Sequence, residues 1–201
     1  MSEIPVARTI REQVADRIRA DVLSGRLTEG TSLREHALAK QYSVSRAPIR
    51  DALLQLTQEG LLVAKPNCGV RVAAVKPETQ SLLVGLRRQV EEFALKNAFK
   101  HFTDEIIEKL DQTVARLRNA CEAEDLAAIV ENDMALHRTI IDTSGNPEVL
   151  PIWLPIVSRM MLHYGRHSNI MDSHREHAAI VSAIRAGDQK AAIAALRANI
   201  Q

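Results

Sequence analysis

Several kinds of residue are scarce in this chain of 201 residues, and each shortage narrows its class. Aromatic residues make up only 3%, which disfavours a β-sandwich, because strands are enriched in them. The two cysteines, Cys68 and Cys121, lie far apart, so we expect a reducing cytoplasm rather than a disulfide framework. No signal peptide opens the sequence and no apolar run approaches the ~20 residues of a membrane span. We therefore expect a helical protein packed through Leu, Ile and Ala, with no membrane partner.

Net charge is also small, at +1, which excludes a generally basic nucleic-acid coat protein. The distribution is more informative. Residues 1–75 carry 11 Lys and Arg against 8 Asp and Glu, whereas residues 76–201 carry 15 against 17. The length allows two domains, and we place the boundary here. Residues 1–75 then have the mild basic excess of a DNA-binding domain.

The first 60 residues have the pattern of three helices. Ile10, Val14, Ile18 and Val22 recur every four residues and predict a helix over 7–24. Ser32 and Glu35 have the spacing of a capping box and predict the start of a second helix at Ser32. A third helix is predicted from its N-cap Ser45 to Gly60, with an apolar stripe at Ile49, Leu53 and Leu56.

The third helix concentrates polar chemistry at its start. Ser45, Arg46 and Arg50 lie at its N-terminal end, and the two arginines share a face because they are four residues apart. Such a face suits phosphates and guanine edges. Residues 61–63 and 70–72 read as two strands of a hairpin, in which Lys65 would contact phosphate. The helices, the basic face and the hairpin together predict a winged helix-turn-helix. A helical hairpin with two exposed arginines is the alternative.

The segment VSRAPIRDALLQLTQEGLL, with NCGVRV after it, resembles the DNA-binding domain of GntR-type bacterial transcription regulators over residues 10–72. The resemblance implies that operator DNA is contacted by one set of residues. These are Arg34, Ser45, Arg46, Arg50 and the wing around Gly69. His36 departs from relatives that carry arginine at this position.

Residues 76–201 read as almost wholly helical and predict an antiparallel bundle of six helices. The expected ranges are 78–101, 103–121, 124–143, 148–167, 172–186 and 188–201. The motifs LRRQVEEFAL, ENDMALHRTIIDTSGNP and EHAAIVSAIRAGDQKAAIAAL resemble the FCD effector domain of the FadR subfamily of GntR regulators.

Polar residues interrupt the apolar stripes of this bundle. Asp133 and His137 lie among the apolar positions of their helix, and His177, like His174, does so in a later helix. A buried charge is costly unless it is paired or metal-bound. Oxygen and imidazole ligands suit Zn, Ni, Mn or Fe. The sequence therefore predicts a divalent metal site, with a core histidine paired to Asp133 as the alternative.

The resemblance adds two residues. Metal-binding FCD domains place a fourth ligand, a histidine, in the last helix, where this chain has Asn199, a weaker donor. Arg87 matches an R-x-x-x-E motif of the family and is expected to bind a small carboxylate effector; the alternative is an ordinary surface pair with Glu91. Arg159, His163, Arg166 and His167 are further candidates for lining the pocket.

The function expected from these features is that of a homodimeric transcription regulator, a repressor controlled by an organic acid near the metal. A metal-free regulator and a metal sensor remain open as alternatives. A metalloenzyme is disfavoured, because no general base stands out and an enzyme would not need a winged helix.

Overall fold

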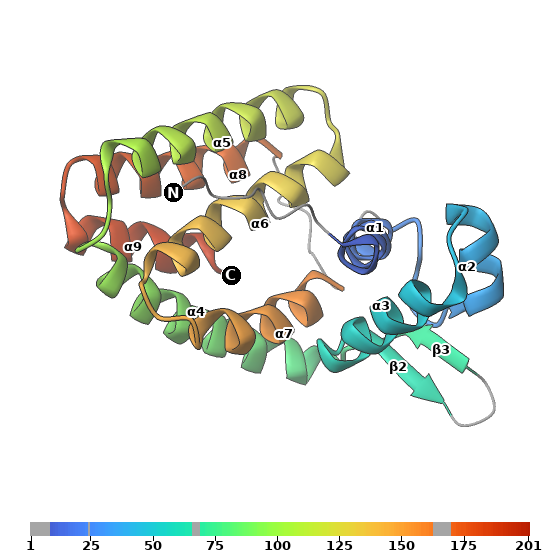
Figure 1. Ribbon diagram of the computed structural model, residues 1–201. Coiled ribbons are helices and arrows are strands. Elements are labelled where there is room, and N and C mark those ends of the chain that lie inside the picture. Colours follow the sequence, from blue (N-terminus) through green and yellow to red (C-terminus); the bar gives the residue numbers. More distant parts are fainter. Residues whose placement is uncertain (1–8, 24, 66–68, 163–169) are drawn as a thin grey trace, which may run out of the picture. The chain divides into compact units, whose positions relative to one another are not determined.

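The computed structural model describes residues 9–23, 25–65, 69–162 and 170–201 (Figure 1). The chain divides into two compact units, Met1–Ala74 and Val75–Gln201. Among the described residues, no helix combines the length and the apolar character that crossing a bilayer requires.

The first unit consists of three helices and a small sheet. The helices are α1 (Ile10–Leu23), α2 (Glu35–Tyr42) and α3 (Arg46–Gln58), and the strands are β1 (Ser32–Leu33), β2 (Leu62–Lys65) and β3 (Gly69–Val72). The apolar stripes explain the packing of α1 against α3. Val14, Ile18 and Val22 are buried as predicted, but Ile10 is exposed and does not belong to the core.

Helix α3 follows its predicted pattern closely. Ile49, Leu53 and Leu56 are all buried, so the stripe spaced by one and two turns forms the inner face. Ser45 occupies the N-cap with extended backbone, although its side chain makes no capping hydrogen bond. Gly60 has a φ of +76° just after the C-cap, the left-handed conformation that favours glycine at a helix end.

The predicted capping box at Ser32 is wrong. Ser32 lies in β1, and α2 begins at Glu35 with the extended Arg34 as its N-cap. The physical reason is main-chain pairing, because Ser32 lies opposite Arg71 of β3. That pairing keeps the segment extended, and the Glu35 side chain bonds elsewhere.

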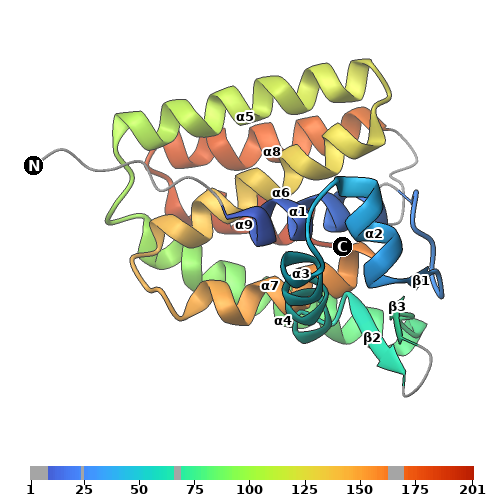
Figure 2. The same ribbon diagram turned by 45° about the vertical axis from the view of Figure 1, so that its right-hand side comes forward.

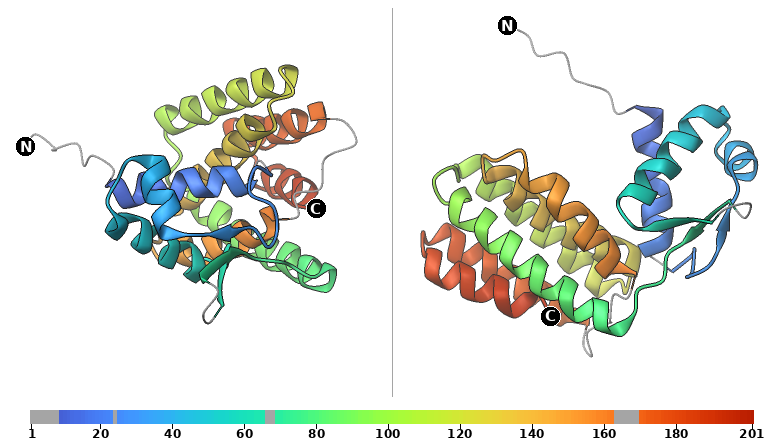
Figure 3. Two further views of the ribbon diagram at one scale, coloured as in Figure 1. Left: turned by 90° about the vertical axis from the view of Figure 1, so that its right-hand side faces the viewer. Right: turned by 90° about the horizontal axis from the view of Figure 1, so that it is seen from below.

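The sheet has three strands in the order β1-β3-β2, all antiparallel. The predicted hairpin is therefore present, but β1 extends it and the first hairpin strand runs from Leu62 to Lys65 instead of 61–63. Leu61 is instead fully buried before the strand. Figure 3 shows β2 and β3 beside the end of α3, with which β2 is in contact.

The second unit is helical throughout its described part, as predicted. Its six helices are α4 (Pro77–Ala98), α5 (Asp104–Glu122), α6 (Leu126–Thr143), α7 (Val149–Met161), α8 (Ile170–Arg185) and α9 (Gln189–Asn199). Two N-caps are made by aspartates, since Asp125 accepts from Ala127 and Ala128 and Asp188 accepts from Ala191. Such caps satisfy main-chain N–H groups that a helix leaves unpaired.

The helices of this unit pack around an aliphatic core. Helix α5 lies alongside α6 and α8, and α4 packs on α6, α7 and α9 (Figures 1 and 2). Leu95, Leu110, Leu136, Ile140 and Ile180 are all buried in one cluster, which joins α4, α5, α6 and α8. The contacts between helices hold α4, α6, α7 and α8 around a group of buried polar side chains.

Candidate functional site

The N-terminal end of α3 presents two guanidinium groups to solvent. Arg46 and Arg50 have side chains that are 62% and 64% exposed. Both pair with Glu35, whose Oε2 lies 3.2 Å from Arg46 Nη2 and whose Oε1 lies 3.3 Å from Arg50 Nε. The arginines lower the pKa of the Glu35 carboxyl, the hydrogen bond from Arg50 most of all.

The other residues predicted to contact DNA lie in the same unit and are exposed. Ser45 is the N-cap of α3 and Arg34 that of α2. Lys65 ends β2 opposite Gly69, which opens β3. Gly69 has a φ of +75°, so a side chain there would strain the backbone. Their contacts with DNA remain predictions.

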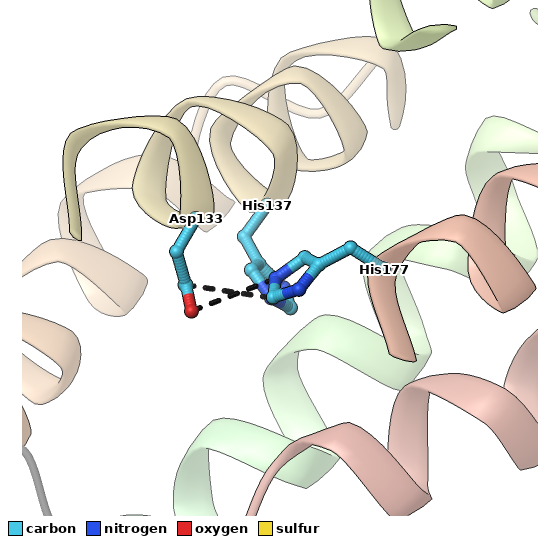
Figure 4. A group of neighbouring side chains, drawn as sticks. All are labelled: Asp133, His137 and His177. Carbon is cyan, nitrogen blue, oxygen red and sulfur yellow. Dashed lines mark hydrogen bonds and ion pairs between the residues drawn. The ribbon is translucent and has the colours of Figure 1, made fainter. Parts of the chain in front are cut away.

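A second group of polar residues is buried in the helical unit. Asp133 and His137 project from α6 and His177 from α8, and the three side chains point toward one another (Figure 4). His137 Nε2 lies 3.2 Å from His177 Nε2. The Asp133 carboxylate lies 3.7 Å from the first nitrogen and 3.5 Å from the second. One atom from each residue can therefore face a common point, and these atoms lie within 4.8 Å of one another.

The outer nitrogen of each imidazole has a fixed partner. His177 Nδ1 lies 2.6 Å from the carbonyl oxygen of Ser173, and His137 Nδ1 lies 2.5 Å from Glu91 Oε2. A carbonyl and a carboxylate accept hydrogen bonds, so each Nδ1 donates. In a neutral imidazole the other nitrogen is then an acceptor. Two nitrogen lone pairs and a carboxylate thus face the same point, which calls for a proton or a cation.

Glu91 connects this group to two further helices. Its Oε1 accepts from Arg87 Nε and from Trp153 Nε1, each at 2.6 Å, while its Oε2 accepts from His137. The Arg87 guanidinium also approaches Asp133, with Nη2 3.8 Å from Oδ1. Because the side chains of Arg87 and Glu91 are only 5% and 1% exposed, the alternative of a surface pair is wrong.

The electrostatics of the group favour ionised carboxylates. Burial raises the pKa of Glu91, but Arg87 and His137 outweigh it and lower the pKa from 4.5 to about 2. Burial also raises the pKa of Asp133, and the neighbouring His177 reverses that and lowers it. For His177, burial lowers the pKa, but Asp133 outweighs burial and the net pKa is raised. With neutral imidazoles the group has one more negative than positive charge, which suits a cation.

The donor set passes a chemical test for a divalent metal. One carboxylate and two imidazole nitrogens are ligands that Zn, Ni, Mn and Fe accept. Each histidine has a hydrogen-bonded outer nitrogen, the arrangement that orients metal-ligating imidazoles. Three side chains leave coordination positions open, as in sites where a further molecule binds. The same set suits each of these four metals.

None of the remaining candidates that the structure describes belongs to this group. The Asn199 amide donates to Glu176 Oε2 at 3.0 Å, a contact that directs it to Glu176. His174 is half-buried and is not among the grouped residues. His163, Arg166 and His167 lie outside the described residues, and Arg159 lies in the last turn of α7.

Sequence reasoning missed Glu91 and Ser173 as partners of the histidines, and Trp153 as a partner of Glu91. One signal was available for Glu91. Leu83, Arg87, Glu91, Ala94 and Ala98 are spaced by one turn and are all buried along α4, so Arg87 and Glu91 interrupt an apolar stripe just as Asp133 and His137 do. Trp153 is the single tryptophan of the chain and is fully buried, but its spacing gave no signal of its partner.

Known proteins match this chain over nearly its whole length. Residues 10–72 match the family described as bacterial regulatory proteins, gntR family, and residues 83–201 match the FCD domain. The chain belongs to the GntR family of regulators and carries an FCD domain. It is accordingly a member of a family of transcription regulators and not of an enzyme family.

Individual relatives agree with this assignment. The gluconate operon transcriptional repressor of Bacillus licheniformis is 25% identical over 199 residues, which cover 93% of this chain and 80% of the relative. The transcriptional repressor NanR of Escherichia coli (strain K12 / DH10B) is 27% identical over 228 residues, covering 98% and 84%. The solved structure of Escherichia coli McbR/YncC shares the fold, with a TM-score of 0.84 at 21% identity and coverage of 97% and 95%.

Proposed function

We propose that this GntR-family regulator is a repressor that binds operator DNA through the first turns of α3. The observation that carries the proposal is the pair of exposed guanidinium groups on Arg46 and Arg50 at the start of the second helix of a helix-turn-helix. In such motifs, the N-terminal residues of that helix reach base edges in the major groove. Further contacts with DNA would come from Arg34, Ser45, Lys65 and Gly69. The gluconate operon repressor and NanR are both repressors by name, which supports repression and not activation as the effect of binding.

The experiment is a binding titration with a duplex selected from a random-sequence library by the full chain. Arg46→Ala and Arg50→Ala should each weaken binding of the selected duplex by about tenfold or more, since a bidentate arginine contributes ~1–3 kcal/mol of base discrimination. Arg17→Ala is the matched control, because Arg17 is equally exposed but lies on α1. Unchanged affinity in both α3 variants would refute the assignment of the recognition helix.

We further propose that Asp133, His137 and His177 hold a divalent metal ion. The support is chemical, because two imidazole acceptors and a carboxylate converge where a proton or a cation is needed. Glu91 and Ser173 would keep both imidazoles in the tautomer that ligation requires. A bound ion would act as a Lewis acid with positions left for an oxygen ligand.

The effector proposed for this site is a small organic acid. A carboxylate can complete a set of three protein ligands, and the Arg87 guanidinium beside Asp133 adds positive charge at the same place. The name of one relative refers to gluconate, which is itself a carboxylate. Arg87 is therefore proposed to serve the effector indirectly, by holding Glu91 and by its charge. A regulator that senses the metal alone is the competing hypothesis.

We propose that two copies associate through α4 and α7. All the large apolar side chains that are exposed in the described part of the helical unit belong to these two helices: Leu82, Leu86, Phe93 and Ile152. Phe93 and Ile152 also line one shallow depression. Exposed apolar residues that gather on one face mark an interaction surface. A two-fold dimer would present two copies of α3 to half-sites one helical turn, roughly 34 Å, apart.

A further inference from the structure

The two exposed arginines of α3 do not stand alone in the structure. Glu35, the first residue of α2, contacts both of them, with its two carboxylate oxygens shared between Arg46 Nη2, Arg50 Nε and Arg50 Nη2 at 3.2 to 3.3 Å. The Glu35 side chain is 30% exposed, about half the exposure of the Arg46 and Arg50 side chains, so the guanidinium groups are the more accessible partners. One carboxylate thus bridges residues one helical turn apart on a face turned to solvent.

This contact has little to contribute to folding. Ion pairs between exposed side chains are screened by water and stabilise proteins only slightly. Both arginines here are more than 60% exposed. The simplest interpretation is therefore an ordinary surface ion pair whose removal changes nothing. A role in DNA recognition is the alternative, because the same guanidinium groups are the proposed base contacts.

The carboxylate changes what the arginines can do in two ways. It cancels one of two positive charges, which reduces their attraction to the phosphates of any DNA. It also fixes two long side chains that would otherwise lose conformational freedom on binding. A guanidinium reads guanine through a planar pair of hydrogen bonds, so its orientation matters for base recognition far more than for phosphate contact.

We propose that Glu35 is a specificity-determining residue of the DNA interface. It holds Arg46 and Arg50 in the orientation that reads base edges, and it weakens their binding to unrelated sequences. This inference rests on the proposed function of α3 in DNA binding. Through Glu35, helix α2 would contribute to discrimination between DNA sequences without itself contacting a base.

The test compares binding of two duplexes, one selected from a random library by the wild-type chain and one with the same bases scrambled. Glu35→Gln should bind the scrambled duplex more tightly than the wild type does, and its affinity for the selected duplex should not increase. The ratio of the two affinities should fall by about tenfold, the loss expected when one bidentate base contact is impaired. Glu35→Asp, which keeps the charge but shortens the reach, should also lower the ratio.

Two controls separate positioning from charge and from misfolding. Glu29→Gln removes the same charge from an exposed position of the same unit, and it should raise both affinities equally and leave their ratio unchanged. Thermal unfolding of Glu35→Gln should match the wild type. If Glu35→Gln and Glu35→Asp also leave the ratio unchanged, Glu35 is only a surface partner and the inference is wrong. If the wild-type chain selects no sequence at all, the proposed function itself fails.

Discussion

Replacing Glu91 by Gln tests whether the carboxylate of Glu91 holds the buried side chains of Arg87 and His137 in place. The substitution keeps the shape of the side chain but removes its charge, and it gives His137 Nδ1 an amide or a neutral oxygen in place of a carboxylate. Arg87 then loses its charged partner at 2.6 Å while remaining buried. Breaking a buried ion pair by removing one partner costs ~3–5 kcal/mol.

The expected cost lies at the lower end of that range. Asp133 remains 3.8 Å from Arg87 and compensates part of its charge, and the amide oxygen introduced by Glu91→Gln can still accept from Trp153. We therefore expect the free energy of unfolding to fall by about 3 kcal/mol. Affinity for added divalent metal should fall by roughly 10- to 100-fold, because the orientation of His137 loses its support.

The assay is denaturant unfolding followed by circular dichroism with a chelator present, and then metal titration followed by the fluorescence of Trp153. Arg118→Gln is the matched control, since Arg118 makes an i, i+4 pair with Glu122 in which both side chains are more than half exposed, and it should cost less than about 1 kcal/mol. A Glu91→Gln variant as stable as the control variant would refute the view that Glu91 organises the group.

Three further predictions concern the wing, the pH dependence and the dimer. Lys65→Ala should weaken binding to all duplexes alike and reduce the salt slope of the affinity by about 1, as expected for one lost phosphate contact; a change in base preference alone would contradict this. The hydrogen bond from Lys96, opposed by burial and assisted by Arg197, lowers the pKa of Glu92. Because the pKa of Glu92 is lower in the folded than in the unfolded chain, its carboxylate stabilises the fold above pH 4.5. This stabilisation is lost as the pH falls through the folded pKa. Glu92→Gln should therefore flatten the loss of stability below that pH, and an unaltered curve in acid unfolding experiments would refute the assignment. Phe93→Asp should convert dimers to monomers in sedimentation experiments, whereas the same change at the exposed Lys100 should not; persistence of the dimer in Phe93→Asp would place the interface elsewhere.

The helices could be predicted from the sequence because their apolar stripes are local signals. The stripe of Ile49, Leu53 and Leu56 indicated both the existence and the inner face of α3. The start of α2 could not be predicted, because Ser32 fits a capping box as well as a strand. Its pairing with Arg71, far along the chain, decided the matter. Such long-range pairing leaves no trace in a short window of sequence.

The candidate metal ligands likewise divide into residues with a local sequence signal and residues without one. Asp133, His137 and His177 were predicted from polar residues that break apolar stripes, and the structure brings all three together. The partners of their outer nitrogens were not predicted, because Glu91 meets His137 across helices and Ser173 offers a main-chain carbonyl, which carries no side-chain signal. Asn199 was expected from the position of a family ligand, yet its amide bonds Glu176. Its contribution to metal binding stays a prediction.

The metal site of Asp133, His137 and His177 is tested by measuring the metal content of the chain, purified without chelator or a metal-binding tag. We expect about one divalent ion per chain in the wild type and in His174→Ala, and none in His177→Ala. His174 is a matched control because it is the same residue type one turn earlier and lies outside the group. The contrary result is a wild-type chain that holds no metal and takes up none from Zn, Ni or Mn, or a His177→Ala variant that keeps its ion.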